Sequence, residues 1–546
     1  MSDDYRKPLV DAAESKTLRM RGNSLHGNRE TLETPPLECG RGRSEKVQDR
    51  TSDMHVFRES DDSIVPEKRV NKAGPRAAAE PVEGRESTKG NATQTLLAPD
   101  SVPGKRGRGL LGVREAAKRD KTMRFTALLH HVNPELLRAS FFELKRQAAP
   151  GVDGMTRHEY GRNLEERLDD LHGRIHRGAY RAQPSKRAWI PKADGRQRPL
   201  GIAALEDKIV QQAVKTVLEQ VYEEDFLGFS YGFRPGRSCH NALDALWMGI
   251  AHRKVNWVLD ADIRGFFDNI DHEWLLKFVE HRIADRRILR LIQKWLRAGV
   301  SEDGKWSRTT VGTPQGSVIS PTLANVFLHY VFDLWANQWR NRYARGSVIM
   351  VRYADDFVVG FQDRGDAERF LRELRRRFER FGLQLHPDKT RLIEFGRYAA
   401  ERRAERGLGK PETFDFLGFT HYCGTTRKGT FTIKRKSVAK RMRAKLQEIK
   451  QQLRRRMHDA VVEVGGWLRS VVRGWFNYHA VPGNSDRLNQ FRTQVQRLWW
   501  RVLRSRSQKG RCWTWVRMDR LIRRWLPTAR ILHPYPEQRL IVNYPR

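Results

Sequence analysis

Cysteine is scarce in this chain of 546 residues. The four cysteines, Cys39, Cys239, Cys423 and Cys512, lie far apart, and no two of them form a C-x-x-C pair. This spacing argues against a zinc knuckle or a disulfide framework and favours a reducing compartment. The sequence also has no signal peptide and no apolar run as long as the roughly 18 residues of a membrane-spanning helix. We therefore expect neither export nor contact with a membrane.

Acidic residues are outnumbered, with 65 Asp and Glu against 103 Lys and Arg and a net charge of +38. A chain this basic usually has a polyanionic partner, because each phosphate that it neutralises releases counterions. The excess is uneven. Residues 427–546 contain 30 Lys and Arg but 6 Asp and Glu, whereas residues 1–118 contain 22 and 19. We expect the strongest grip on nucleic acid in the C-terminal quarter.

Aromatic residues are almost missing from residues 1–118, where only Tyr5 and Phe57 occur. This segment has too little apolar area to offset the entropy of ordering. We predict a mostly disordered extension, which is either a flexible RNA-contacting arm or an inert leader. The remaining chain is longer than one ordinary domain, so several modules are expected there.

Two acidic stretches carry the chemistry. Residues 347–352 and 357–361 are mostly apolar or β-branched, and Ala354, Asp355 and Asp356 lie between them, which predicts a β-hairpin. Adjacent carboxylates there repel each other and lose hydration unless a cation lies between them, and Mg²⁺ prefers such oxygen ligands. One Asp-Asp pair can be a simple polar turn. However, residues 255–263 predict a second buried strand that ends in Asp262, and three carboxylates suit a two-metal site for phosphoryl transfer.

Three motifs, in this order, resemble the reverse transcriptases encoded by bacterial group II introns. They are DADIRGFFDNIDH at 260–272, TPQGSVISPTLAN at 313–325 and YADD at 353–356. The resemblance covers about residues 122–535 and implies an α+β fold, a right-hand polymerase with fingers and an antiparallel palm sheet followed by an α-helical thumb or maturase domain. The implied divisions are an extension at 1–118, fingers at 119–250, palm at 251–425, thumb at 426–498, and a basic Trp-rich segment at 499–546 with no endonuclease domain.

The resemblance assigns residues to the incoming dNTP. Residues 187–192 and 196–202 predict a hairpin with a D-G turn. On this hairpin, Lys192 and Arg198 match the positions that hold the triphosphate, Lys as a point charge and Arg as a planar fork. Cations on an exposed hairpin are often merely solvated, which is the simpler interpretation.

Two further residues are implied at the nucleotide. A bulky aromatic just past the first catalytic acid would exclude the ribose 2′-OH, and Phe267 is the preferred match, although core packing would explain Phe266 or Phe267 equally well. Gln315 would lie beside the base pair being formed, and Gly316 would allow the backbone to approach closely.

Contacts with nucleic acid are implied at several basic residues. Arg234 and Arg237 lie in a loop that resembles the template-strand region, although solvation of a loop is the alternative. Residues 382–390, which include Lys389, and residues 414–419 resemble segments that complete the palm and touch the primer backbone. In the thumb, the candidates are Arg454, Arg455 and Arg456, for which a solvated helix face is the alternative.

The sequence therefore predicts an RNA-directed DNA polymerase and intron RNA splicing maturase that supports group II intron mobility. Asp262, Asp355 and Asp356 would be its catalytic residues and its Mg²⁺ ligands. The expected partners are intron RNA, an RNA template, a DNA primer or target and dNTPs, in the bacterial cytoplasm and associated with the nucleoid; whether the chain forms a dimer stays open. The alternatives are a domesticated or defence-associated reverse transcriptase without a splicing role, and a splicing protein with a dead polymerase.

Overall fold

The computed structural model describes residues 107–539 apart from 192–196, 303, 308 and 310. Lys192 and residues 1–106 of the predicted extension therefore lie outside the described residues. Within the description, ordered structure begins earlier than residue 119, because α1 (Gly107–Arg119) is helical. Val113 and Ala117 of α1 are buried against α5 (Leu205–Asp225). The apolar residues of α1 recur at helical spacing, which explains why this short segment packs.

The predicted fingers begin with helices and end in a small sheet. The helices are α2 (Pro134–Glu143), α3 (Arg157–Tyr160) and α4 (Leu164–His176), followed by the almost fully buried α5. The predicted hairpin is confirmed by the antiparallel strands β1 (Ser185–Pro191) and β2 (Gln197–Ile202). β1 also pairs in parallel with β4 (Val300–Glu302), which pairs with β5 (Lys305–Ser307). A later segment thus joins the fingers sheet.

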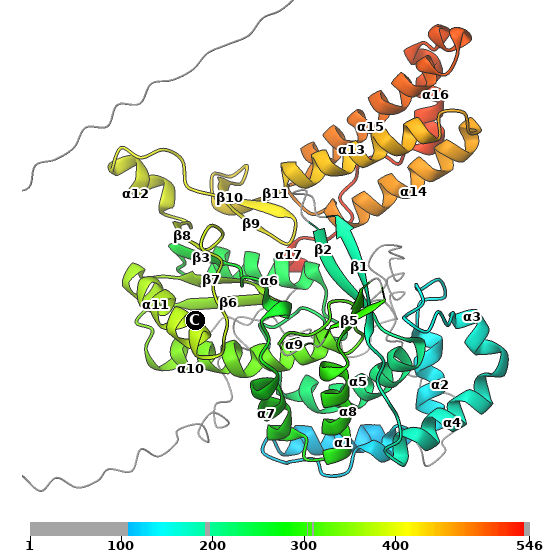
Figure 1. Ribbon diagram of the computed structural model, residues 1–546. Helices are drawn as coiled ribbons and strands as arrows, with labels where there is room; N and C mark the ends of the chain where they lie inside the picture. Colours follow the sequence, from blue (N-terminus) through cyan, green and yellow to red (C-terminus); the bar gives the residue numbers. More distant parts are fainter. Residues whose placement is uncertain (1–106, 192–196, 303, 308, 310, 540–546) are drawn as a thin grey trace, which may run out of the picture. The chain divides into compact units, whose positions relative to one another are not determined.

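A second sheet carries both acidic stretches. Its strands, in the order β6-β7-β3-β8, are β6 (Val348–Tyr353), β7 (Asp356–Phe361), β3 (Trp257–Ala261) and β8 (Arg391–Glu394). All neighbouring strands are antiparallel. α6 (Cys239–His252) packs against the sheet on one side and α11 (Arg364–Arg380) on the other (Figure 1).

Side chains of this sheet alternate between two apolar cores, as the period of two in a strand requires. Ile349 and Val351 point to the core that includes α6, whereas Met350 and Val359 join the core that includes α11. Because both faces are covered, these strands consist of nearly continuous apolar runs rather than a polar alternation. This explains why the sequence pattern revealed the strands.

Further helices are α7 (His272–Arg282), α8 (Arg286–Arg297), α9 (Ser320–Leu328) and α10 (Leu334–Arg342). Short 3₁₀ turns occur elsewhere in the chain, at Leu129–His131, Gly161–Asn163, Phe266–Asp268 and Gln508–Cys512. A π-helical stretch, His329–Asp333, lies directly between α9 and α10. Such stretches change the direction in which side chains point. Here the change delivers Asp333 to the sheet.

Asp333 makes a fully buried ion pair with Arg352 of β6. Arg352 Nε donates to Asp333 Oδ1 (2.7 Å), and the other guanidinium nitrogens donate to Asn325 Oδ1 (3.0 Å), Ser230 Oγ (2.7 Å) and the Ala354 carbonyl (3.0 Å). One side chain therefore joins the tip of the acidic hairpin to α9, the π-helical stretch and the loop that precedes α6.

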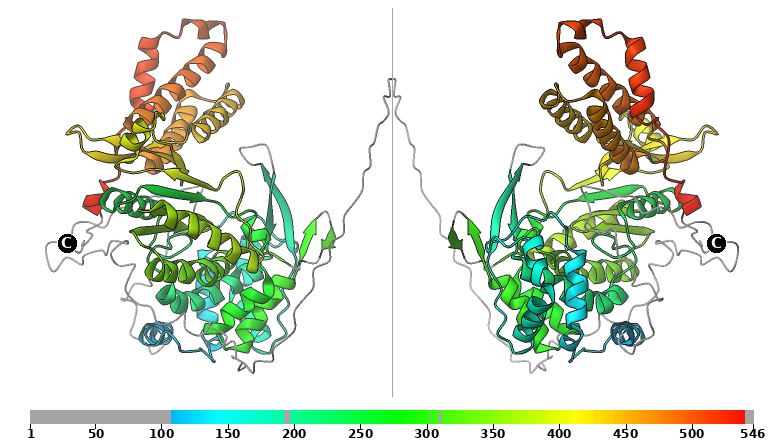
Figure 2. Two further views of the ribbon diagram at one scale, coloured as in Figure 1. Left: turned by 90° about the vertical axis from the view of Figure 1, so that its left-hand side faces the viewer. Right: turned by 90° about the vertical axis from the view of Figure 1, so that its right-hand side faces the viewer.

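The C-terminal part is a helical bundle on a short sheet. The sheet contains β9 (Phe414–Phe416), β10 (Phe419–Thr425) and β11 (Phe431–Ser437), and α12 (Ala399–Glu405) precedes it. The helices are α13 (Ala439–Arg455), α14 (Val461–His479), α15 (Ser485–Ser505) and α16 (Trp515–Trp525), drawn in orange and red in Figure 2. Their shared core includes Leu468, Phe491 and Trp499. The predicted boundaries at 425/426 and 498/499 thus fall inside the β10–β11 hairpin and inside α15.

The last described residues return to α6. His533 stacks on His240 with ring centroids 3.9 Å apart. α17 (Pro536–Arg539) contacts α6, and Arg539 Nε lies 3.2 Å from Asp244, which also pairs with Arg435 of β11. We call residues 526–539 the C-terminal strap. No helix in the described part of the chain is both long and apolar enough to cross a membrane.

We expect Asp333→Asn to lower the free energy of unfolding by about 3–5 kcal/mol, because it leaves the buried guanidinium of Arg352 without its counter-ion. Glu368→Gln is the matched control, since it breaks the exposed 2.8 Å pair with Arg364 and should cost less than about 0.5 kcal/mol. Denaturant unfolding of both variants measures the difference. Equal losses would show that the buried pair does not stabilise the fold.

Candidate active site

The acidic hairpin turns within two residues. Tyr353 pairs with Asp356 at the end of the β6–β7 ladder, so Ala354 and Asp355 form the turn, and the predicted hairpin is confirmed. Ala354 adopts a left-handed backbone with a φ of 58°. Gly232 lies directly against it, since a Cβ at that position would be 2.2 Å from the Ala354 nitrogen. Only glycine lets this loop approach the turn so closely.

Strand pairing brings Asp262 to the hairpin. Ala261 is the partner of Phe357 in the antiparallel β3–β7 ladder, so the next residue, Asp262, lies beside Asp356. Asp262 and Asp355 are half-buried, and Asp356 is exposed. The three predicted acids thus meet at one edge of the sheet.

Burial and like charge perturb these acids. Burial raises the pKa of Asp355, the nearby Asp262 adds to this rise, and Arg198 and Lys389 oppose it. Burial in the cleft, followed by the charges of Asp355 and Asp262, raises the pKa of Asp356 to about 7. Asp356 is exposed as a whole residue, but it lines the cleft beside Asp260 and Asp262, where like charges crowd its carboxylate. The group is partly protonated near neutral pH.

Two cations neutralise Asp260 on β3 and Asp262, the first residue after β3. Lys389 Nζ contacts Asp262 Oδ2, and Arg391 Nη2 lies 3.6 Å from Asp260 Oδ2. Burial raises the pKa of Asp260 to about 6, and Arg391 limits the rise. Sequence reasoning missed Asp260 as a site residue, although its spacing of two from Asp262 places both carboxylates on the same side of the strand.

Carboxylate oxygens are the ligands that hard divalent cations prefer. Within the described residues, however, no group of three or more His, Cys, Asp or Glu side chains is arranged to hold a metal ion. The contact of Lys389 with Asp262 gives a physical reason. The chemistry of the donors fits a divalent cation, and the lysine must release Asp262 before all three acids can share one.

The residues implied for the dNTP come together from separate segments. Arg198 Nε on β2 donates to Gln315 Oε1 (2.6 Å), and Gln315 Nε2 donates to Asp268 Oδ1 (3.2 Å). The Gln315 carbonyl accepts from the Gly201 nitrogen (2.7 Å). Asp268 was not anticipated from the sequence, and it links Gln315 to the turn that carries Phe267.

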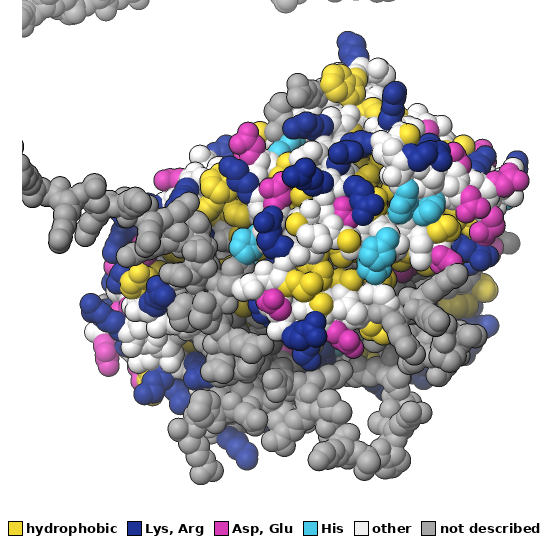
Figure 3. All heavy atoms as spheres, turned by 90° about the horizontal axis from the view of Figure 1, so that it is seen from below, with side chains coloured by type: hydrophobic (Ala, Val, Ile, Leu, Met, Phe, Trp, Pro, Cys, Tyr) yellow, Lys and Arg dark blue, Asp and Glu magenta, His cyan; other side chains and the backbone are white. Residues whose placement is uncertain are grey.

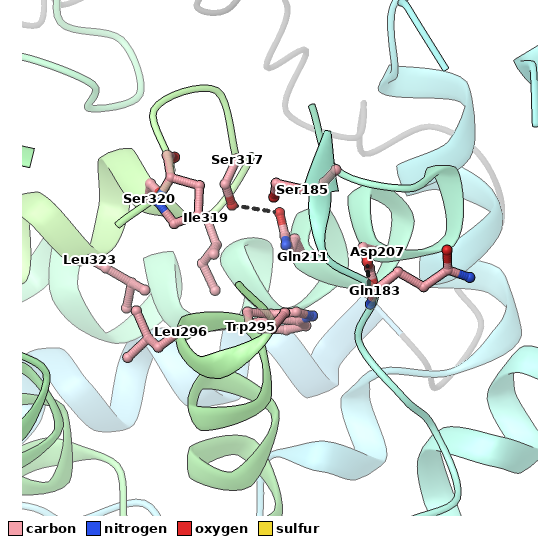
Figure 4. A pocket seen from close by; sticks show the side chains of 13 residues that line it. Gln183, Ser185, Asp207, Gln211, Trp295, Leu296, Ser317, Ile319, Ser320 and Leu323 are labelled. Atoms are coloured by element: carbon pink, nitrogen blue, oxygen red, sulfur yellow. Dashed lines mark hydrogen bonds between the residues drawn. The ribbon is translucent and has the colours of Figure 1, made fainter. Parts of the chain in front are cut away.

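The Gln315 loop is anchored from below. Gln211 of α5 accepts hydrogen bonds from Ser317 Oγ (2.8 Å) and from the Val318 nitrogen (3.0 Å), as Figure 4 shows for Ser317. A pocket of about 10 Å³ lies between this loop, α5 and Trp295. This volume has room for about one water molecule, which is too small for a substrate.

The two adjacent phenylalanines take different places. The Phe266 ring is almost fully buried and contacts Phe327 of α9 at a centroid distance of 6.4 Å. The Phe267 ring is 9% exposed and meets Phe233 edge-on at 6.4 Å. This difference favours Phe267 as the ring nearer to a bound nucleotide.

Arg234 is placed differently from the prediction. Its side chain is 4% exposed, pairs with Glu223 at 3.0 Å, and donates to the carbonyls of Leu227 (2.8 Å) and Ser230 (2.9 Å). Burial lowers its pKa to about 10. Since its donors are already used inside the protein, we withdraw Arg234 as a contact with nucleic acid. Arg237 also donates from Nη1 to the Ser230 carbonyl (3.2 Å), but it is half-exposed and stays a candidate.

The predicted thumb arginines also differ from one another. Arg454 and Arg455 are exposed at the end of α13, whereas Arg456 is half-buried, lies 5.3 Å above the Trp467 ring and pairs with Asp459 at 3.5 Å. Basic side chains also occur on surfaces away from these three arginines. The face shown in Figure 3 carries many Lys and Arg side chains with Asp and Glu scattered among them.

Known proteins resemble this chain in the same region. The family model described as reverse transcriptase (RNA-dependent DNA polymerase) matches residues 190–421. Protein YkfC of Escherichia coli strain K12 is 34% identical over 311 residues, which are 50% of this chain and 81% of that protein. The group II intron-encoded protein LtrA of Lactococcus lactis subsp. cremoris is 35% identical over 225 residues. The chain belongs to the group II intron type of reverse transcriptase.

Coverage differs between the relatives of this reverse transcriptase. The match to LtrA spans 41% of the chain but 37% of LtrA. Nuclear intron maturase 1 of Arabidopsis thaliana is 27% identical over 92 residues, which are 17% of the chain and 13% of that protein. The family match runs from β1 to β10, so it contains every predicted catalytic acid and ends before α13. Reverse transcriptases use divalent metal ions, which agrees with the carboxylate donors.

The raised pKa of Asp356 predicts a pH-dependent stability. Its pKa in the folded protein, about 7, exceeds the ordinary value of 3.8, so the folded state holds a proton that the unfolded state releases. Stability of the metal-free protein should therefore fall as pH rises from about 4 to 7. We expect Asp356→Asn to remove part of this fall and to be more stabilising at pH 8 than at pH 5. Denaturant midpoints in EDTA test this, and an identical pH dependence in both proteins would contradict it.

Proposed function

We propose that this protein is an RNA-directed DNA polymerase that also acts as a maturase for a group II intron RNA. The observation that carries the polymerase function is the convergence of Asp262, Asp355 and Asp356 at one sheet edge, with Arg198 close enough to oppose the raised pKa of Asp355. Nucleotidyl transfer requires acids that bind metal ions and cationic groups, such as the Arg198 guanidinium, that bind the phosphates.

In the proposed reaction the 3′-hydroxyl of a primer attacks the α-phosphorus of a dNTP in line. A bond forms between the 3′-oxygen and the α-phosphorus, and the bond from the α-phosphorus to the α–β bridging oxygen breaks. Pyrophosphate leaves with that oxygen, and the hydroxyl proton passes to solvent. Asp262, Asp355 and Asp356 would hold Mg²⁺, whose charge favours the deprotonated hydroxyl and the leaving pyrophosphate.

The side chains around the acids would position the substrates. Arg198 would exchange its contact with Gln315 for oxygens of the triphosphate, with Lys192 as a second cation on the same hairpin. Gln315 would then face the new base pair, and the Phe267 ring would fill the space that a ribose 2′-hydroxyl needs. Lys389 would leave Asp262 when metal binds and would face the nucleic acid.

We further propose that residues 119–250 and 251–425 act as fingers and palm, and that α13–α16 form the thumb. Two facts support a maturase role for this bundle: its high positive charge, and the relatives that carry intron or maturase in their names. Intron RNA, the RNA template and the DNA primer or target would be the macromolecular partners, in the bacterial cytoplasm at the nucleoid. A reverse transcriptase without a splicing role is the alternative, and a splicing assay separates the two.

We expect Asp262→Ala and Asp355→Ala each to reduce primer extension by more than about a hundredfold, beyond the 10–100-fold typical of residues that only support metal ligands. RNA binding should stay within about twofold, because the basic surface lies elsewhere. Asp388→Ala is the control, since this acid lines the same cleft with a side chain that is 89% exposed. Extension of a primed RNA template with Mg²⁺ and dNTPs provides the measurement. Normal synthesis by either variant would exclude the assigned acids.

The thumb surface gives a separate prediction. Replacing both Arg454 and Arg455 by Gln should make the binding constant for intron RNA less dependent on salt. The slope of the logarithm of this constant against log salt should shrink in magnitude by about 1.4 to 1.8, or about 0.7–0.9 for each lost phosphate contact. Splicing should weaken more than extension of a short primer.

Arg456→Gln is the matched control for the salt slope. Its contacts with Trp467 and Asp459 predict a loss of stability with little change in slope. If the double variant keeps the wild-type slope while it is folded, intron RNA binds elsewhere.

A further inference from the structure

A cleft of about 360 Å³ runs from the catalytic acids to the first helix of the bundle. Its lining includes Asp260, Asp262 and Asp356 of the acidic stretches, and Leu417, Gly418 and Arg441 from later segments. Three basic side chains line this cleft. Lys389 and Arg391 are paired with Asp262 and Asp260, as described above. The third, Arg441 of α13, is exposed and makes neither an ion pair nor a hydrogen bond with any described residue.

The turn beneath Arg441 is strained and tightly held. Leu417 and Gly418 connect β9 to β10 and both have positive φ, 45° and 85°. A leucine rarely adopts this conformation, and strain of this kind persists where the surroundings enforce it. Here Tyr478 of α14 donates to the Leu417 carbonyl (2.7 Å), and the Val438 nitrogen donates to the Gly418 carbonyl (3.1 Å).

The turn also fixes where Arg441 lies. A Cβ on Gly418 would be 2.9 Å from Arg441 Nη1, so the guanidinium rests on the one residue of the turn that has no side chain. Arg441 lines the same cleft as Asp262 and Asp356. The guanidinium is therefore held beside the acids, although it belongs to the helical bundle rather than to the sheet.

Arg441 and Arg198 lie at different places around the acids. Arg441 lines the cleft together with Asp262 and Asp356, whereas Arg198 is not among the residues that line it and donates to Gln315 instead. In-line transfer needs the attacking strand and the leaving triphosphate on opposite sides of the reacting phosphorus. With Arg198 assigned to the triphosphate, Arg441 is left for the strand that attacks.

We propose that Arg441 is a positioning residue that binds the phosphodiester nearest the 3′ end of the primer strand. This inference rests on the proposed polymerase function. The planar guanidinium can donate two parallel hydrogen bonds to phosphate oxygens, which fixes orientation as well as charge. The helical bundle thereby controls the position of the 3′-hydroxyl over the acids.

The test is equilibrium binding of a primer–template by the full chain without dNTP, with primers that carry either a normal or a methylphosphonate linkage next to the 3′ end. Arg441→Gln should weaken binding of the normal primer about tenfold, the scale of a lost charge-assisted hydrogen bond. The neutral linkage should weaken wild-type binding by a similar factor but weaken the variant little further. Arg441→Lys should fall between the two, because it keeps the charge and loses the fork.

Arg443→Gln is the matched control. Arg443 is equally exposed on α13 but lies roughly 200° around the helix axis and away from the cleft, so its removal should change binding of either primer less than twofold. A higher KM for dNTP with unchanged primer binding in Arg441→Gln would place Arg441 at the triphosphate and overturn the proposal. Independent, multiplying effects of the variant and the methylphosphonate would overturn it as well. These binding results stand apart from synthesis, whereas failure of the wild type to extend any primer would refute the proposed polymerase function.

Discussion

The buried pair of Arg352 and Asp333 is the interaction on which the active site depends. A charged guanidinium without exposure to water is tolerated only when every donor is matched, and Arg352 meets this demand with groups from four segments. One of its acceptors is the carbonyl of Ala354, which forms the turn of the acidic hairpin together with Asp355. The hairpin tip therefore cannot shift without disturbing the pair. Backbone hydrogen bonds between Arg352 and the loop that includes Phe229 and Tyr231 add to this fixation.

The same arrangement explains how a strained turn persists. The described residues with positive φ other than glycine are Phe233, Ala354 and Leu417. All three border the proposed reaction centre. Phe233 contacts the Phe267 ring, Ala354 is in the turn of the acidic hairpin, and Leu417 lines the cleft beside the acids. Each is held by contacts from outside its own turn. Strain collects where the geometry of a reaction has to be kept, and the surrounding fold supplies the energy.

Local pattern explains what could be predicted from the sequence. The β6–β7 hairpin, the β1–β2 hairpin and the strand before Asp262 each depend on neighbours within a few residues, and all three are present. The meeting of Arg198 with Gln315 was implied by resemblance to a family rather than by pattern.

Long-range packing explains what could not be predicted. Arg234 is buried because Glu223 of a preceding helix and nearby carbonyls surround it, and nothing in its own loop signals this. Trp499 similarly belongs to the bundle core rather than to a separate basic tail. Arg441 reaches the cleft through a tertiary contact between a helix and a distant turn. Charged residues have no periodicity that distinguishes a buried partner from a solvated face, so such assignments require the folded structure.

The C-terminal strap has a consequence for biosynthesis. Asp244 of α6 is almost fully buried between Arg435 and Arg539, and His240 of the same helix is covered by His533. A ribosome adding 5–20 residues per second needs roughly 15 to 60 seconds to go from α6 to the strap. Until the strap arrives, one side of α6 lacks the cover of His533 and the counter-ion Arg539. The nascent chain therefore completes the support of α6, which packs on the sheet with the acids, only when the C-terminal strap arrives.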